Sequence, residues 1–201
     1  MSDGTKPYHH NNLREALIQQ GITMLHRDGV QNFSLRKLAK EVGVSATACY
    51  NHFSCAEELF REMLDYITDR FTNALSDAIE KNPCNSITVS MGCAYVEFFA
   101  TYPHYFSLLF DSGNLGIHIT DSEIHFDDSF PPFAVFVKGA KQEMAALQID
   151  EAGLRDNLLI MWATVHGLAA MANMKGIHYD GSWRELTEKL LFSKVNLSCR
   201  K

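Results

Sequence analysis

The sequence predicts an all-α protein in which a small N-terminal helix-turn-helix domain precedes a larger helical domain, with about nine helices in total. Three observations support this fold class. Apolar residues recur at helical spacing along most of the chain, two short helical patterns meet at Gly43, and no segment shows the alternation of a half-buried strand. We expect the two domains to comprise residues 1–56 and 57–201.

The first helix is expected from about residue 12 to residue 27, and Asp28-Gly29 ends it. Asn12 and Glu15 have the spacing of a capping box. The apolar stripe of this helix consists of Leu13, Ala16, Leu17, Gly21, Met24 and Leu25.

The next two helices form a helix-turn-helix pattern between Ser34 and Phe53. The first has an apolar face at the spacing i, i+3, i+4 and i+7, which consists of Leu35, Leu38, Ala39 and Val42. Gly43 provides the backbone freedom for a sharp turn, and Ser45 can cap the second helix. In this motif the second helix enters the major groove of DNA.

A capping box at Ser54 and Glu57 predicts the start of a long helix that Asn82-Pro83 ends. The segment from Asp111 to Ser129 is polar and lacks helical periodicity, so we interpret it as a long loop. The remaining helices are expected at about residues 86–102, 103–110, 131–147, 150–174 and 182–191.

The helix expected from Asp150 to Met174 is apolar or small on nearly all sides. Such a helix must be covered on every face, and Gly167 within it indicates a close approach by another element. We therefore expect a homodimer through the last two helices.

Composition and charge exclude several classes of protein. No apolar run is long enough to span a bilayer and the N-terminus lacks the apolar core of a signal peptide, so we expect a cytoplasmic protein with no membrane partner. The net charge is −6, but residues 1–56 carry +2, which suits a domain that meets phosphates. The motifs of common hydrolases and phosphate-binding enzymes are absent, so we predict a protein that is not an enzyme and needs no cofactor.

The five cysteines, or the two histidines of the polar segment, could suggest a metal site or a redox function. The cysteines are scattered, which excludes a disulfide framework and disfavours a structural zinc site. Cys55, near a helix start, leaves redox sensing open. His118 and His125 lie among acidic residues, but their spacing matches no known ligand pattern, so we predict no metal site.

The segment from Gly29 to Leu59 resembles the TetR family of bacterial transcriptional regulators. The residues that carry the resemblance are Gly29-Val, Phe33-Ser-Leu, Leu38-Ala, Val42-Gly-Val-Ser, Tyr50, His52-Phe, Glu57 and Leu59. Trp162 and His166-Gly167 are similar to the Trp-His-Gly signature of one subgroup of this family.

The resemblance implies a homodimer that binds a pseudo-palindromic DNA operator and acts as a repressor released by a small apolar or amphipathic effector. The positions that match DNA contacts in the family are Ser34, Arg36, Lys37, Ser45, Ala46, Thr47, Tyr50, Asn51 and His52. Many members have a Lys where Ala56 stands, so we expect this chain to lack one phosphate contact.

Aromatic residues at helical spacing are usually core, but their number here also suits an effector pocket. The candidate ligand-binding residues are Tyr95, Phe98, Phe99, Phe106, Phe110, Trp162 and His166. His166 could instead bond a carbonyl in the core or meet a partner subunit. Two further alternatives remain open, control by a protein partner and control by cysteine oxidation.

Overall fold

The structure is a computed structural model that describes residues 10–111, 115–121, 123–126, 130–146 and 151–198. The chain divides into two compact units, Met1–Ile67 and Thr68–Lys201. The long helix α4 (Ala56–Lys81) contributes residues to both units. The functional boundary that we place at residue 56 therefore stays a prediction.

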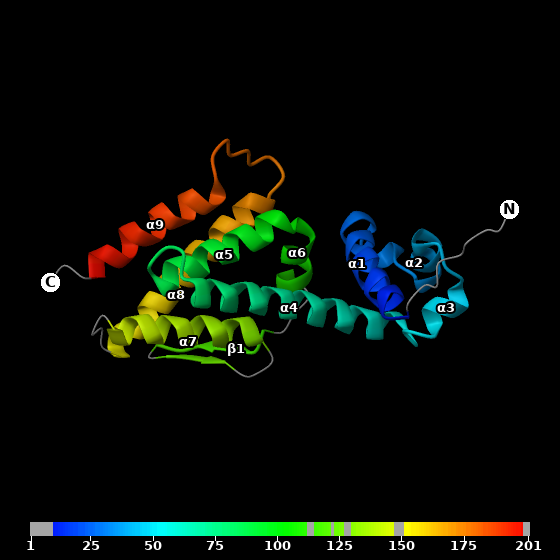
Figure 1. The fold of residues 1–201 in the computed structure, drawn as a ribbon, viewed down its shortest axis with the longest axis horizontal. Coiled ribbons are helices and arrows are strands. Elements are labelled where there is room, and N and C mark those ends of the chain that lie inside the picture. Colours follow the sequence, from blue (N-terminus) through cyan, green and yellow to red (C-terminus); the bar gives the residue numbers. More distant parts are fainter. Residues whose placement is uncertain (1–9, 112–114, 122, 127–129, 147–150, 199–201) are drawn as a thin grey trace. The chain divides into compact units, whose positions relative to one another are not determined.

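The first unit contains α1 (His10–Asp28), η1 (Val30–Asn32), α2 (Leu35–Val42), α3 (Ala46–Tyr50) and the start of α4 (Figure 1). The predicted stripe of α1 lies inward, with Leu17 fully buried and Met24 nearly so. Gly21 is required where α4 approaches, because a Cβ at this position would overlap the Met63 side chain. The side chain of Asn12, half of the predicted capping box of α1, lies outside the described residues.

The predicted capping box at the start of α4 is correct in kind but wrong in its partner. Glu58, not Glu57, accepts hydrogen bonds from both the backbone N–H and the hydroxyl of Ser54, each at 2.7 Å. These bonds lower the pKa of Glu58. Because α4 begins at Ala56, one residue later than expected, the acid that reaches back is also one residue later.

The second unit is built around α5 (Ile87–Thr101), which packs against helices on several sides. Its neighbours are α6 (Pro103–Asp111), α7 (Pro131–Ala146), α8 (Glu151–Asn173) and α9 (Trp183–Ser198). Gly92 permits the close packing, since a Cβ there would overlap Leu191 of α9 and lie 3.1 Å from Val165 of α8. The part of the chain that the structure describes thus contains nine α-helices, as predicted.

Residues 111–129 are not simply a loop, so that prediction was wrong. Within them β1 (Ile117–Ile119) and β2 (Ile124–Phe126) pair antiparallel, with His118 opposite His125. Each strand is only three residues long, and a tip held by the Thr120 hydroxyl and Glu123 closes the hairpin. Such short strands carry too little alternation to be recognised in a polar segment.

One apolar side of α8 is buried, with Leu158, Val165 and Ala169 at most 4% exposed, but the other side is open among the described residues. Ile160, Met171 and Met174 are 47%, 41% and 55% exposed, and Gly167 has nothing within 4 Å of the space that a Cβ would take. The close neighbour expected at Gly167 is thus absent among the described residues of this one chain. None of the described helices has the length and hydropathy needed to cross a membrane.

Candidate nucleic-acid interface and effector cavity

The turn between α2 and α3 has the geometry that the sequence predicts. Gly43 adopts the left-handed conformation (φ 79°, ψ 28°), where a side chain would be strained. The N–H of Val44 donates to the carbonyl of Ala39 at 2.9 Å, so the first helix ends in a hydrogen-bonded turn. Ala39 is 1% exposed, and its small side chain leaves room for the second helix to cross closely.

The residues of α3 divide cleanly between an inner and an outer side. Cys49 is fully buried, and burial raises the pKa of its thiol. Phe53, just beyond the helix, is also fully buried. The candidate DNA contacts lie on the other side, where Ser45, Thr47, Tyr50 and Asn51 are exposed and Ala46 and His52 partly so.

Serine N-caps fix the first turns of α2 and α3 and so orient the outer side of the motif. The Ser45 hydroxyl accepts from the N–H of Ala48 at 3.1 Å and begins α3, as the sequence predicts. At α2 the Ser34 hydroxyl accepts from the N–H of Lys37 at 3.3 Å. Neither serine needs DNA to hold its position, and each keeps spare hydrogen-bonding capacity.

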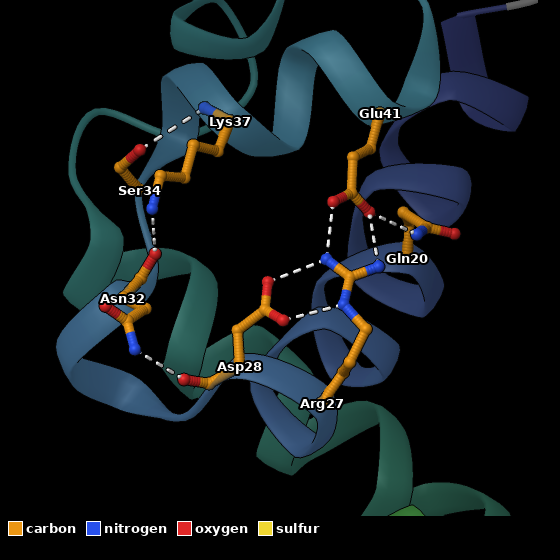
Figure 2. Close-up of polar contacts among 7 residues, drawn as sticks. All are labelled: Gln20, Arg27, Asp28, Asn32, Ser34, Lys37 and Glu41. Atoms are coloured by element: carbon orange, nitrogen blue, oxygen red, sulfur yellow. Dashed lines mark hydrogen bonds and ion pairs between the residues drawn. The ribbon is translucent and has the colours of Figure 1, made fainter.

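Arg36 and Lys37 are exposed on α2, which places two cations on the outside of the motif. The Lys37 ammonium also donates to the carbonyl of Asn32 at 2.9 Å, and the Asn32 amide donates to the carbonyl of Asp28 at the same distance (Figure 2). An ammonium has three protons to donate, so Lys37 can hold this contact and still meet a phosphate.

An ion-pair network joins α1 to α2 beside these residues, as Figure 2 shows. The Arg27 guanidinium bonds to the Asp28 carboxylate and, at 2.6 Å, to that of Glu41, which also accepts from Gln20 at 2.8 Å. These bonds raise the pKa of Arg27 and lower the pKa values of Asp28 and Glu41. Sequence reasoning did not identify this network, because residues 27 and 41 come from different helices.

In the second unit, aromatic rings gather around α5. Tyr95, Phe98 and Phe99 contact Phe71 of α4 at centroid distances of 5.0, 5.2 and 4.8 Å. Phe110 contacts Phe99 and His166 at 5.4 and 4.7 Å. Phe106 contacts Phe99 and His166, and Trp162 contacts His166. The structure therefore brings all seven candidate ligand-binding residues into one connected aromatic cluster.

A small cavity with about 20 Å³ of free space, part of it open to solvent, borders this cluster. Of the seven candidates only Tyr95 and Trp162 line it, and the remainder of its wall is apolar. That remainder consists of Phe71, Leu75, Phe130, Pro132, Phe133, Phe136 and Val165. Sequence reasoning missed the α7 part of this wall, although Phe133 and Phe136 lie three residues apart on the helix that Pro131 begins.

A polar pair lies within this apolar region. The Tyr95 hydroxyl and His166 Nδ1 are 2.9 Å apart, and the Trp162 side chain also bonds to Tyr95. An indole N–H can only donate, so the tyrosine oxygen accepts from Trp162, and the direction of its bond to Nδ1 is set by the tautomer of His166. Burial raises the pKa of Tyr95 and lowers that of His166, so both groups are held neutral.

The two histidines of the hairpin lie opposite each other on β1 and β2. His118 and His125 face each other with ring centroids 6.5 Å apart, and His125 pairs with Glu123 at 3.1 Å. Among the described residues, converging side chains of metal-binding type occur elsewhere, at Cys84, Cys93 and Glu188.

Comparison with known proteins identifies the family of the DNA-binding segment. Residues 17–63 match the model of bacterial regulatory proteins of the tetR family, and this range contains the whole α2–turn–α3 motif. Over 92% of its length the chain is similar to the structure of a TerR/AcrR-family transcriptional regulator from Aquifex aeolicus, at 15% identity with a TM-score of 0.60 and 98% of that chain covered. Residues 17–63 therefore carry the DNA-binding segment of the TetR family, and the chain as a whole shares the fold of the solved regulators.

Two further relatives set the extent of the similarity. A Rhodococcus sp. RHA1 protein of unknown function is 26% identical over 94% of this chain and 96% of its own, with a TM-score of 0.70. The nucleoid occlusion factor SlmA of Shewanella sediminis is 35% identical over 65 residues, 32% of this chain. The match spans about a third of that curated relative's length, 33%.

The matched segment contains the helix-turn-helix, which is the DNA-binding motif of TetR-family regulators. The Trp-His-Gly subgroup stays a prediction. Ala56, the departure noted in the sequence, begins α4 and is partly exposed, so a longer side chain fits at this position.

Proposed function

We propose that the protein is a repressor that binds a pseudo-palindromic operator as a homodimer and is released when a small apolar or amphipathic effector enters the α5–α7–α8 cavity. The observation that carries the proposal is the cavity, because an aromatic wall with one buried polar pair is typical of small-molecule sites. The proposal assigns each of three surfaces a separate role.

The outer side of α3 reads the operator. Thr47 and Ala46 offer a hydroxyl and methyl groups to base edges, while Tyr50, Asn51 and His52 lie where phosphates pass. The similarity to SlmA spans only 65 residues, about a third of each chain, so it gives no support for nucleoid occlusion.

The open side of α8 supports the homodimer. Ile160, Gly167 and Met171 lie on one helical face, with Met174 exposed just beyond the end of the helix. The Thr164 hydroxyl bonds to the carbonyl of Ile160 at 2.6 Å, so that its methyl group is available for packing. An isologous contact between two such faces would bury apolar surface and place small residues where the backbones meet.

The cavity selects the effector. The free space in the cavity is only about 20 Å³, close to what one water molecule needs, so the effector must enlarge the cavity as it binds. Aromatic walls favour a ring or branched chain, and this enlargement would have to expose the Tyr95 hydroxyl, now bonded to His166, before it could meet a carbonyl or hydroxyl.

Selection of binding sequences from random duplexes with the purified full chain tests operator binding. We expect two inverted half-sites about 34–36 Å apart or slightly more. Recovery of no preferred sequence would refute specific DNA recognition. Sedimentation velocity on the same sample tests the dimer, and a chain that stays monomeric at all concentrations would refute it.

Native mass spectrometry and a thermal-shift screen of small aromatic ketones, phenols and branched acids test the effector. The proposal predicts a compound that raises the melting temperature and lowers operator affinity. If no compound does both, and a pull-down instead finds a protein that displaces the operator, the alternative of control by a protein partner replaces this one. Displacement by mild peroxide that Cys55→Ser abolishes would favour the oxidation alternative.

A further inference from the structure

Three potential ligand groups converge away from the aromatic cavity. Cys84 lies in the connection between α4 and α5, Cys93 on α5 and Glu188 on α9. The two sulfur atoms and one carboxylate oxygen lie within 4.8 Å of one another, and they form the one such group among the residues that the structure describes. Residues from three segments meet here, and this convergence is independent of the proposed effector.

We propose that Cys84, Cys93 and Glu188 bind a thiophilic divalent cation, with zinc as the reference ion. Zinc takes sulfur at about 2.3 Å and carboxylate oxygen at about 2.1 Å in tetrahedral geometry, which places two sulfur ligands roughly 3.8 Å apart. The observed group needs only small side-chain movements to reach this arrangement. Water takes the fourth position.

Local structure holds the sulfur of Cys84 in place. The N–H of Cys84 donates to the hydroxyl of Ser90 at 3.2 Å, and that hydroxyl donates to the Asn82 side-chain oxygen at 3.0 Å. Asn82 and Asn85 both adopt positive φ angles, 38° and 53°, so the chain turns sharply on each side of the cysteine. These bonds tie the connection to the first turn of α5.

Cys93 is fully buried and its thiol contacts the carbonyl of Arg184 at 3.7 Å, at the start of α9. Cys84 and Glu188 are partly exposed and provide the entrance for an ion.

The charges of the ligands and of the neighbouring Arg184 also suit a divalent cation. Two thiolates and the Glu188 carboxylate carry three negative charges, and a divalent cation leaves one. Arg184 lies close enough for both thiols to raise the pKa of its guanidinium, and it bonds to Glu97 at 2.8 Å, which keeps it beside the site. A monovalent negative complex next to a guanidinium is favourable in a partly buried place.

Titration of the reduced, untagged full chain with Co²⁺, followed by competition with Zn²⁺, tests the proposal. We expect one Co²⁺ per chain with sulfur-to-metal absorption in the near ultraviolet and the visible bands of tetrahedral cobalt, both lost when Zn²⁺ displaces it. Zn²⁺ should also raise the melting temperature of the chain, because it links α9 to the α4–α5 connection.

Four variants locate the ion. Cys84→Ser and Cys93→Ala should each remove the sulfur absorption, and Glu188→Gln should weaken Co²⁺ binding at least tenfold. Cys55→Ser is the matched control, an exposed cysteine outside the site, and should change nothing. Far-ultraviolet circular dichroism checks that each variant is folded, and Cys84→Ser, at a partly exposed position, decides the question if Cys93→Ala does not fold. Absence of sulfur absorption in the wild-type chain, or its persistence in Cys84→Ser, would overturn the proposal.

Discussion

In the first unit, the outward-facing residues are positioned by bonds to neighbours in the sequence, whereas in the second unit the functional groups come from helices far apart in the chain. Ser45 is fixed by the N–H three residues later, but the Tyr95 hydroxyl is fixed by His166, 71 residues away. The difference implies that substitutions on α3 should act separately, whereas those around the cavity should act together. The variants below test this contrast.

The largest effect is expected at the open face of α8. A Cβ at Gly167 would have no atom of the described residues within 4 Å, and leucine improves helix propensity, so Gly167→Leu should not harm folding. In a dimer packed at Gly167 the larger side chain would hold the backbones apart. We expect sedimentation to show monomers and operator affinity to fall about 100-fold or more.

Lys141→Glu on α7 is the control for this variant, because it changes an exposed residue on another helix. If Gly167→Leu remained dimeric with normal operator affinity, the assignment of this face to the dimer would be wrong.

The second effect is expected at the cavity. Phe133→Trp adds volume to its wall, and we expect at least a tenfold loss of effector affinity by calorimetry, with operator affinity unchanged in the absence of effector. Tyr95→Phe removes the polar pair and should weaken polar effectors more than apolar ones. An unchanged effector affinity in both variants would place the effector elsewhere.

The third effect separates base reading from phosphate contact on α3. Thr47→Ala should alter base preference at one or two positions, by about 1 kcal/mol each. Tyr50→Phe should weaken binding to every sequence by roughly 1 kcal/mol, the usual loss for one hydrogen bond. Fluorescence anisotropy with operator variants measures both, and the reverse pattern would exchange the two roles.

A smaller change is expected from Ala56→Lys. The added ammonium at the start of α4 should reach a phosphate, which tightens binding and steepens the plot of log affinity against log salt by about 1 per subunit. Anisotropy at several salt concentrations gives the slope, and Ala56→Gln, of similar length without charge, is the control. An unchanged slope would mean that residue 56 does not face the DNA backbone.

The smallest effect concerns the ion-pair network. The folded chain lowers the pKa values of Asp28 and Glu41, so their contribution to stability is present above the ordinary carboxylate pKa of about 4 and is lost as pH falls below it. Urea unfolding should show Arg27→Gln less stable than wild type at pH 7, with the gap closing by pH 3. The gap should be small because all three groups are solvent-exposed. If the difference in stability between Arg27→Gln and wild type did not change with pH, its cause would be lost packing. Arg61→Gln, which changes an exposed arginine on α4, is the control.

The sequence by itself determined the local features of the chain. The helix-turn-helix, the cap at Ser45 and the division of α3 into inner and outer sides depend on contacts within a few residues, and the structure contains each of them. The errors also had local causes. The capping acid was misplaced by one residue, and three-residue strands were too short to recognise.

Only the tertiary structure decided which aromatic rings border the cavity, that Arg27 bonds to Glu41, and that Cys84 and Cys93 meet Glu188. Spacing along a helix gives the face on which a residue lies but not the face of another helix that it meets. In α5, where residues on nearly every side are buried, periodicity could not separate core rings from cavity walls. The packing of α7, α8 and α9 around α5 decides which rings lie in the core and which line the cavity.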